Sequence, residues 1–210
     1  MPELYRSLAV PASAQIKIEG SRFIADAMPA ADESSAKELL ESVRKRYFDA
    51  THHCFAYVIG GEQWTVRYSD DGEPSGTAGV KIHSAVEAQG LADVLLVVTR
   101  YYGGTKLGVG GLGRAYFDAA VQVLTAARFI TKAVVQELRI TFPYDLTNPV
   151  MNIITHQQLT IGSTEYTDSS TVITLHLLPS ATEGVERQLT DATRGGSALE
   201  RGGRRTVVWR

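Results

Sequence analysis

The stretch Leu95–Ala115 reads LLVVTRYYGGTKLGVGGLGRA and organises the rest of the chain. Aliphatic and β-branched residues are followed by six glycines that precede an amphipathic pattern, which predicts a buried strand, a bare loop and a helix start. A helix start offers free N–H groups and a positive dipole end, and Arg100, Lys106 and Arg114 lie beside it. We interpret this loop as an anion site. The alternative is that the glycines only let strand and helix pack closely.

Composition limits the classes of protein to which the chain can belong. It has 210 residues, enough for one large domain or two small ones, and its 21 Lys and Arg against 23 Asp and Glu give a net charge of −2. Any nucleic-acid contact must therefore be a local patch. The single cysteine, Cys54, excludes an internal disulfide. No apolar run has the length of a membrane span or a signal-peptide core, so we expect a cytoplasmic protein that does not contact a membrane.

The first 130 residues mix strand and helix patterns. Residues 32–47 have apolar side chains at helical spacing, with Asp32 or Ser34 as the cap. A Gly60-Gly61 turn predicts a hairpin, and residues 70–76 form a loop before a helix that Thr77 can cap. The expected strands are Leu4–Val10, Gln15–Glu19, Phe23–Met28, His53–Ile59 and Gln63–Ser69.

After Phe129 the pattern restarts in the order βαββαβ, which is typical of a ferredoxin-like unit. We place the boundary near Thr131–Ala133, which gives domains of residues 1–132 and 133–210. The expected elements are strand Val134–Phe142, helix Thr147–Gln158, strands Thr160–Tyr166 and Thr171–Leu178, helix Thr182–Arg194 and strand Arg204–Trp209.

The stretch Gly108–Gly113 matches the dinucleotide-binding pattern G-x-G-x-x-G. That fingerprint also requires an acidic residue about 20 positions later, at the end of the next strand. The nearest acid, Glu137, lies early in the next strand and in the second domain. No G-K-[ST] follows, so the loop is not a P-loop either. We therefore expect no cofactor. The remaining interpretation is that backbone amides near the helix start can bind a phosphate group.

A second polar loop, Ser69–Gly79, reads SDDGEPSGTAG and holds three carboxylates and several hydroxyls. Such a loop can bind a divalent cation whose coordination shell is completed by phosphate oxygens. It can equally hold the arginines of the glycine loop. The alternative is that aspartates and hydroxyls only cap the turns and the helix. A serine or threonine nucleophile needs a histidine base, and the sequence places none there. We assign no catalytic residue and no metal ligand.

These two motifs, with HCFAY at His53–Tyr57, closely resemble the IMPACT family, in particular its bacterial YigZ-like branch. The resemblance implies an α+β protein of two domains. The first is similar to domain IV of elongation factor G, of the left-handed βαβ class, and the second is ferredoxin-like and similar to domain V. Where the family usually has a proline after T-A-G, this chain has Val80, Lys81 and Ile82, and Lys81 can supply a cation.

The family's motif residues, carried onto this sequence, make up the predicted ligand-binding set. They are Asp70, Asp71, Glu73, Ser75, Gly76, Thr77, Arg100, Tyr101, Gly103, Gly104, Lys106, Gly108, Gly110, Gly111 and Arg114.

Three functions follow as hypotheses. The resemblance implies a translation-associated regulator, so the leading one is a protein that binds RNA or the ribosome, with Arg100, Lys106 and Arg114 as cationic contacts and Tyr101 as a stacking face. The second is an enzyme that uses a metal at Asp70 and Asp71 on a nucleotide or other phosphate-containing ligand. The third is a module that binds a protein partner. We favour a binding role over catalysis.

Overall fold

The computed structural model describes residues 2–61 and 63–209, so the ends of the predicted domains at residues 1 and 210 lie outside it. Within the described part the chain forms ten strands and five α-helices. It divides into two compact units, one of residues 5–132 and one of residues 2–4 and 133–209. The fold is therefore α+β with two units and two five-stranded sheets. No helix in the described part is long and apolar enough to span a membrane.

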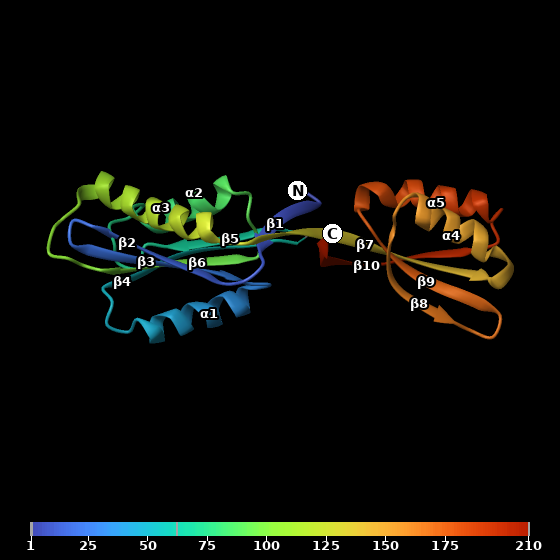
Figure 1. Cartoon of the computed structure of the whole chain (residues 1–210), viewed down its shortest axis with the longest axis horizontal. Coiled ribbons are helices and arrows are strands. Elements are labelled where there is room, and N and C mark those ends of the chain that lie inside the picture. The colour runs from blue at the N-terminus through green and yellow to red at the C-terminus, as the bar shows by residue number, and fades with distance from the viewer. Residues whose placement is uncertain (1, 62, 210) are drawn as a thin grey trace. The chain divides into compact units, whose positions relative to one another are not determined.

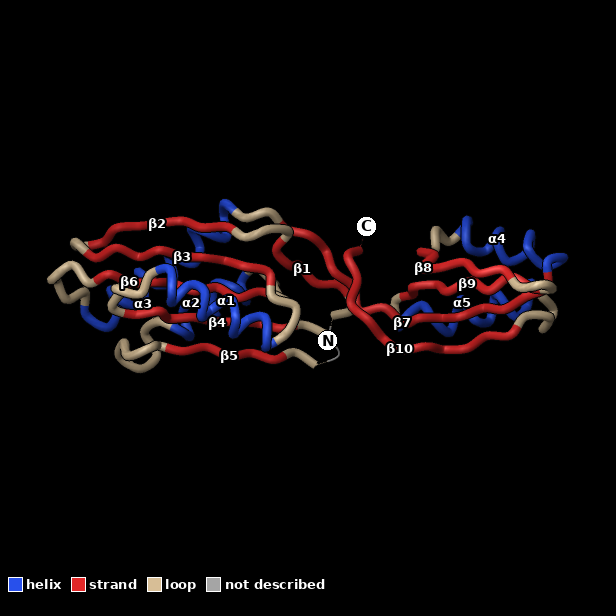
Figure 2. Tube along the Cα trace, turned by 90° about the horizontal axis from the view of Figure 1, so that it is seen from below, coloured by secondary structure: helices blue, strands red, loops and turns tan. Residues whose placement is uncertain are grey.

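The first unit is built on a five-stranded antiparallel sheet. Figure 2 shows its strands side by side. One face is covered by α1 and the other by α2 and α3 (Figure 1). The strands, in sheet order, are β2 (Ala12–Ile18), β3 (Ser21–Pro29), β6 (Val94–Tyr101), β4 (His52–Ile59) and β5 (Thr65–Ser69), and the helices are α1 (Glu33–Arg46), α2 (Gly79–Ala88) and α3 (Gly108–Ala126).

Two helical crossovers in this sheet have opposite hands. In both β3–α1–β4 and β5–α2–β6 the helix joins parallel strands that lie on either side of a third strand. The second crossover differs from the first in three ways. Its strands run in the opposite direction, it crosses the sheet in the opposite sense, and its helix lies on the opposite face. Three reversals invert the hand, so one crossover is left-handed, an exception to the usual right-handed rule.

Alternation along β6 decides which side chains face which helices. Leu95 and Val97 pack with Leu40 and Val43 of α1 in one buried cluster. Arg100, an odd number of residues away, therefore points to the opposite face, under α2 and α3. The predicted cap of α1 is confirmed at Asp32, whose side chain accepts the Ser35 N–H at 2.7 Å.

The start of α3 differs from the expectation that six glycines precede the helix. The helix begins at Gly108, so four of the six lie inside its first two turns and the bare loop shortens to residues 102–107. Glycine has a low helix propensity and no side chain that could show the helical period. The sequence pattern therefore placed the start of α3 too late. Gly104 and Gly108 have φ of +87° and +69°, and open space surrounds the position that a Cβ would take on each, so conformation explains these two glycines.

Gly103 is a close-packing glycine. A Cβ atom on it would lie 2.0 Å from the carbonyl carbon of Gly20, in the turn between β2 and β3. We expect Gly103→Ala to lower the free energy of unfolding of the first unit by about 1–3 kcal/mol, because two backbones must separate. Urea denaturation measures this.

Gly110→Ala is the matched control, since no atom lies within 4 Å of a Cβ at that helical position. There alanine should raise stability by about 0.5–1 kcal/mol. Equal effects of the two variants would contradict the packing role of Gly103.

The second unit follows the predicted βαββαβ order. The second five-stranded sheet has the order β1-β7-β9-β8, with β10 also beside β7, and most of β1 and the first residues of β7 belong to the first unit. The buried core of the second unit gathers Leu138, Ile140, Val150, Ile173 and Leu189. The elements are β1 (Leu4–Leu8), β7 (Phe129–Pro143), a 3-10 turn at Tyr144–Leu146, α4 (Thr147–His156), β8 (Thr160–Tyr166), β9 (Ser170–Leu177), α5 (Pro179–Ala192) and β10 (Ala198–Trp209).

Candidate functional site

Asp70 fixes the acidic loop to the start of α2. Its Oδ1 accepts the backbone N–H groups of Ala78 and Gly79 at 2.9 and 2.8 Å, and its Oδ2 accepts the Gly76 N–H at 2.8 Å. Burial acts to raise the pKa of the Asp70 carboxyl, but these three amide bonds outweigh it and hold the pKa below its ordinary value. The carboxylate thus caps α2 from eight residues earlier in the chain.

Thr77 was expected to cap α2, and this prediction is wrong. Its hydroxyl donates to the carbonyl of Pro74 at 2.6 Å, inside the turn, so the cap is left to Asp70. Ser75 is exposed on the loop surface. Among the described residues, no histidine contacts the hydroxyl of Thr77 or Ser75, so neither has the base that a nucleophile needs.

Asp71 is also bound by the chain itself. Its Oδ2 accepts the His53 backbone N–H at 2.6 Å, and Arg44 Nη2 lies 3.4 Å from Oδ1. The Asp71 carbonyl accepts from His52 Nδ1 at 2.8 Å. A cation between Asp70 and Asp71 would have to displace these bonds. In residues 2–61 and 63–209, His, Cys, Asp and Glu form no group of three that could hold a metal ion.

Glu73 and Arg100 form a buried ion pair between the two motifs. Arg100 Nη1 donates to Glu73 Oε1 at 2.7 Å, and the two side chains are 6% and 4% exposed. Arg100 Nη2 donates to Ser21 Oγ at 3.3 Å. Arg100 Nε is buried, and no hydrogen-bond partner for it exists among the described residues. One of the two interpretations of the acidic loop is that it holds the arginines of the glycine loop. The structure shows such a contact for Arg100, through Glu73.

Tyr116 extends the pair into the core, and it is absent from the predicted ligand-binding set. The Tyr116 hydroxyl donates to Glu73 Oε1 at 2.7 Å, and Cys54 Sγ lies 3.3 Å from the same hydroxyl. Burial raises the pKa of both Cys54 and Tyr116, so the thiol and the phenol stay protonated. The signal that could have found Tyr116 is its helical phase, one turn past Leu112 on the buried stripe of α3.

The first turn of α3 is uncapped, in contrast to that of α2. Its N-cap residue, Leu107, offers no side-chain hydrogen bond, and no acidic residue lies in the first turn. Gly108, Gly110 and Gly111 leave the backbone there bare, and no atom lies within 4 Å of a Cβ position on Gly108 or Gly110. The free N–H groups and the positive dipole end of α3 therefore have no side-chain acceptor among the described residues.

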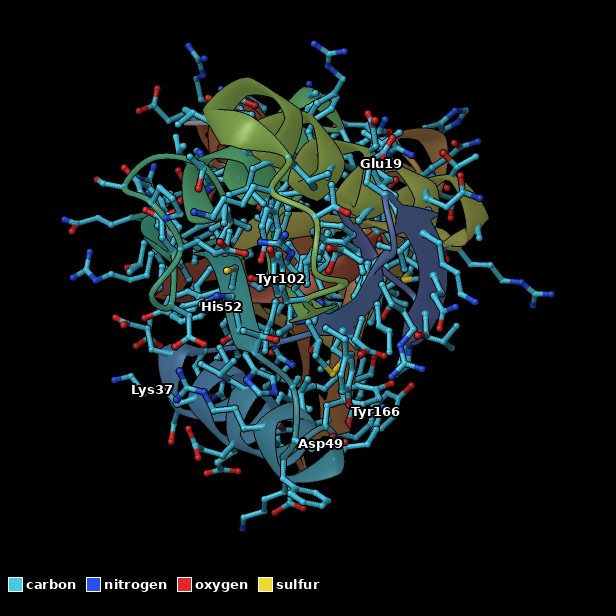
Figure 3. The ribbon with its side chains drawn as sticks, turned by 90° about the vertical axis from the view of Figure 1, so that its left-hand side faces the viewer. Glu19, Lys37, Asp49, His52, Tyr102 and Tyr166 are labelled. Atoms are coloured by element: carbon cyan, nitrogen blue, oxygen red, sulfur yellow. The ribbon has the colours of Figure 1, made fainter. Side chains whose placement is uncertain are left out.

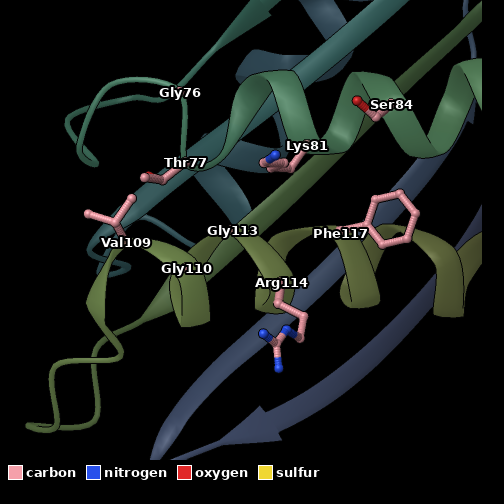
Figure 4. Close-up of a pocket in the computed structure, with 9 residues that line it drawn as sticks. All are labelled: Gly76, Thr77, Lys81, Ser84, Val109, Gly110, Gly113, Arg114 and Phe117. Atoms are coloured by element: carbon pink, nitrogen blue, oxygen red, sulfur yellow. The ribbon is translucent and has the colours of Figure 1, made fainter.

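Three exposed cations surround this helix start: Lys81, Lys106 and Arg114. None of them has a hydrogen-bond or ion-pair partner in the part of the chain that the structure describes. Lys81 lies on α2 and its chain passes 3.4 Å from a Cβ position on Gly113. Figure 4 shows Lys81 on the side of α2 that faces α3, whereas Arg114 points away from α2.

Three cavities among the described residues flank the start of α3, and one of them, of about 320 Å³, is lined by Glu19 and Asp118 as well as by Lys106 and Arg114. The helix cavity, of about 500 Å³, lies between α2 and α3 (Figure 4). The loop cavity, of about 360 Å³, lies on the side of the glycine loop. The helix cavity is lined by Gly76, Thr77, Lys81, Ser84, Val109, Gly110, Gly113, Arg114 and Phe117, and the loop cavity by Glu73, Pro74, Arg100, Tyr102, Lys106, Leu107, Gly108, Val109 and Leu112.

The adjacent tyrosines at the end of β6 have different surroundings. Tyr101 donates to Asp49 Oδ1 at 2.8 Å, and the Arg22 guanidinium covers its ring at 4.1 Å. Tyr102 lines the loop cavity, is 46% exposed, and has the Arg100 guanidinium 5.3 Å from its ring centre. His52 pairs with Arg100 between β4 and β6, so it lies at the same end of the sheet as Tyr102, and both residues are labelled in Figure 3.

The structure thus separates the predicted set into two groups. The first loop binds its own backbone and Arg100 through Asp70, Asp71 and Glu73. The uncapped glycines with Lys106 and Arg114 remain open to solvent, and Lys81 and Tyr102, absent from the predicted set, join them.

Comparison with family models matches residues 19–124 to the Impact N-terminal domain and residues 140–195 to a domain of unknown function, DUF1949. The chain is similar to the IMPACT family member YvyE of Bacillus subtilis, with 32% identity over 90% of this chain and 86% of that protein. It is 41% identical to the IMPACT family member YigZ of Escherichia coli over 55% of this chain and 58% of that protein.

A solved structure also resembles the whole chain. It is described as the crystal structure of a hypothetical protein, and it superposes with a TM-score of 0.65 at 30% identity over 95% of this chain and 97% of that one.

Proposed function

The chain belongs to the IMPACT family, and we propose that it is a translation-associated regulatory protein whose first unit binds RNA, free or in the ribosome, at the start of α3. The observation that carries the proposal is the contrast between two neighbouring helices. Asp70 neutralises the N-terminus of α2, whereas that of α3 is bare and flanked by unpaired cations. An RNA phosphate offers the charge that this helix start lacks.

In this proposal some residues of the site contact the phosphate and the others position them. Gly108 and Gly110 present backbone N–H groups to a phosphate, Gly111 leaves the helix surface beside them without a side chain, and Lys106 and Arg114 add positive charge. The other members of the predicted set position these groups. They are Asp70, Asp71, Glu73, Ser75, Gly76 and Thr77 in the acidic loop and Arg100, Tyr101, Gly103 and Gly104 around the glycine loop.

The charge balance agrees with a local contact. The net charge of −2 gives the molecule no general attraction for RNA, so affinity must come from this patch. The link to translation rests on membership of the IMPACT family, whose motifs imply a role in translation regulation.

Replacing Lys106 and Arg114 together with alanine should weaken binding to a single-stranded RNA 12-mer by about 25-fold at 0.1 M salt. Each lost phosphate contact removes about 0.7 released counterion, so the slope of log Kd against log salt should fall by about 1.4. Fluorescence anisotropy at several salt concentrations measures both quantities.

Lys37→Ala with Lys45→Ala is the matched control. It makes the same change in net charge on α1, which covers the opposite face of the sheet. The control should bind like the parent protein. If both double variants lose the same affinity, binding depends only on the overall charge of the protein and not on this site. If Lys106→Ala with Arg114→Ala binds RNA as tightly as the parent protein, the site is rejected.

A further inference from the structure

The loop cavity is lined by a buried arginine, Arg100. Arg100 is held by Glu73 and Ser21 through its two terminal nitrogens, which fixes the guanidinium in place. Its Nε is left without a partner among the described residues, although the side chain is only 6% exposed and lines the cavity. Because Nε is itself buried, a molecule in the cavity does not reach it, and Arg100 acts on the cavity through its positive charge, which lies 5.3 Å from the ring centre of Tyr102.

The rest of the lining is part aromatic, part aliphatic and part cationic. Tyr102 exposes 46% of its surface, and its backbone N–H is anchored to Thr51 Oγ1 at 3.1 Å. Val109 and Leu107 supply aliphatic surface, with Val109 68% exposed. Lys106 and the bare start of α3 lie along the same cavity. A planar ring with an attached phosphate matches these three kinds of surface.

The size of the cavity points to one nucleotide. Its volume of about 360 Å³ lies near the lower limit of small-molecule sites, about 300–1,000 Å³. An intact duplex buries its bases in the stack and cannot place one there, whereas unpaired bases of single strands stack on aromatic side chains.

We infer that the loop cavity holds one unpaired nucleotide of single-stranded RNA. Its phosphate lies at the start of α3 with Lys106, and its base lies against Tyr102. This inference rests on the proposed function and adds strand and base requirements that phosphate binding alone does not impose.

The test compares three 12-mer ligands by fluorescence anisotropy: single-stranded RNA, its duplex, and a strand of equal charge whose sugars carry no bases. The single strand should bind at least tenfold more tightly than the other two. Tyr102→Ala should weaken single-strand binding by about tenfold without changing the salt slope, because stacking is lost and no phosphate contact is removed. Tyr102→Phe should retain most of the affinity.

Tyr166→Ala is the matched control, since Tyr166 is 74% exposed on β8 of the second unit. It should not change single-strand binding. Circular dichroism melting should show that Tyr102→Ala remains folded.

The outcomes separate the two proposals. If the duplex and the base-free strand bind as tightly as the single strand, or Tyr102→Ala binds like the parent protein, the nucleotide site is rejected. The phosphate site then stands as long as Lys106→Ala with Arg114→Ala loses affinity. If none of the three ligands binds, both proposals are overturned.

Discussion

Arg100→Ala is expected to lower the free energy of unfolding of the first unit by about 3–5 kcal/mol. The substitution leaves the Glu73 carboxylate 4% exposed without its cation, and an unpaired buried charge costs that much. Urea denaturation followed by tryptophan fluorescence measures the loss. The chain has two tryptophans, so a Trp209→Phe background leaves Trp64 as a reporter in the first unit.

A double variant distinguishes the buried charge from simple loss of packing. Arg100→Met with Glu73→Gln removes both charges, fills the volume and keeps an amide oxygen that can accept from the Tyr116 hydroxyl. It should recover more than half of the stability that Arg100→Ala loses, because no ion is left buried. A loss of less than about 1 kcal/mol in Arg100→Ala would show that water reaches Glu73.

Asp70→Ala should destabilise the first unit by about 3 kcal/mol. Three backbone N–H groups lose their acceptor, and two of them belong to the buried residues Ala78 and Gly79. Asp70→Asn keeps one acceptor oxygen and should cost less, about 1–2 kcal/mol at pH 7. The same Trp64 fluorescence measures both variants.

The stability that the Asp70 charge contributes should depend on pH in a defined direction. Its pKa is below the ordinary 3.8 in the folded protein, so the contribution is fully present above pH 3.8 and disappears as pH falls through the folded pKa. The stability difference between the parent protein and Asp70→Asn should therefore stay constant from pH 7 to about 5 and shrink below pH 4. Asp118→Asn, an exposed carboxylate on α3, is the control and should differ from the parent by less than about 0.5 kcal/mol at pH 7. A difference for Asp70→Asn that does not change down to pH 3 would contradict the role of the charge.

Much of the fold could be predicted because hydrophobic periodicity is local. The span of α1 and its cap at Asp32 follow from a repeat within about sixteen residues, and the βαββαβ order of the second unit follows from successive patterns. The start of α3 could not be placed in this way, since glycine supplies neither periodicity nor propensity. Thr77 failed as a cap because the competing acceptor, Asp70, reaches the same amides through the fold of the loop.

The site was predictable in position but not in its internal bonds. The composition of the two loops indicated where the site lies. The contact between Arg100 and Glu73 could not be predicted, because the two residues are 27 positions apart in the chain and only the fold of the sheet brings them together. Alternation could have warned that neighbouring residues of a strand point to opposite faces, so that Arg100 and Tyr101 cannot both serve one ligand. Which tyrosine lines a cavity depends on how the chain leaves β6, and no local pattern encodes that.

The unequal capping of α2 and α3 has a consequence for the kinetics of encounter. A polyanion that approaches from a distance meets a molecule of net negative charge, and it meets attraction only within about one Debye length of the α3 terminus, ~10 Å at 0.1 M salt. Added salt then weakens the distant repulsion and the near attraction together, so the two effects on the association rate oppose each other. If the proposed RNA complex forms, we therefore expect added salt to raise its dissociation rate more than it changes its association rate.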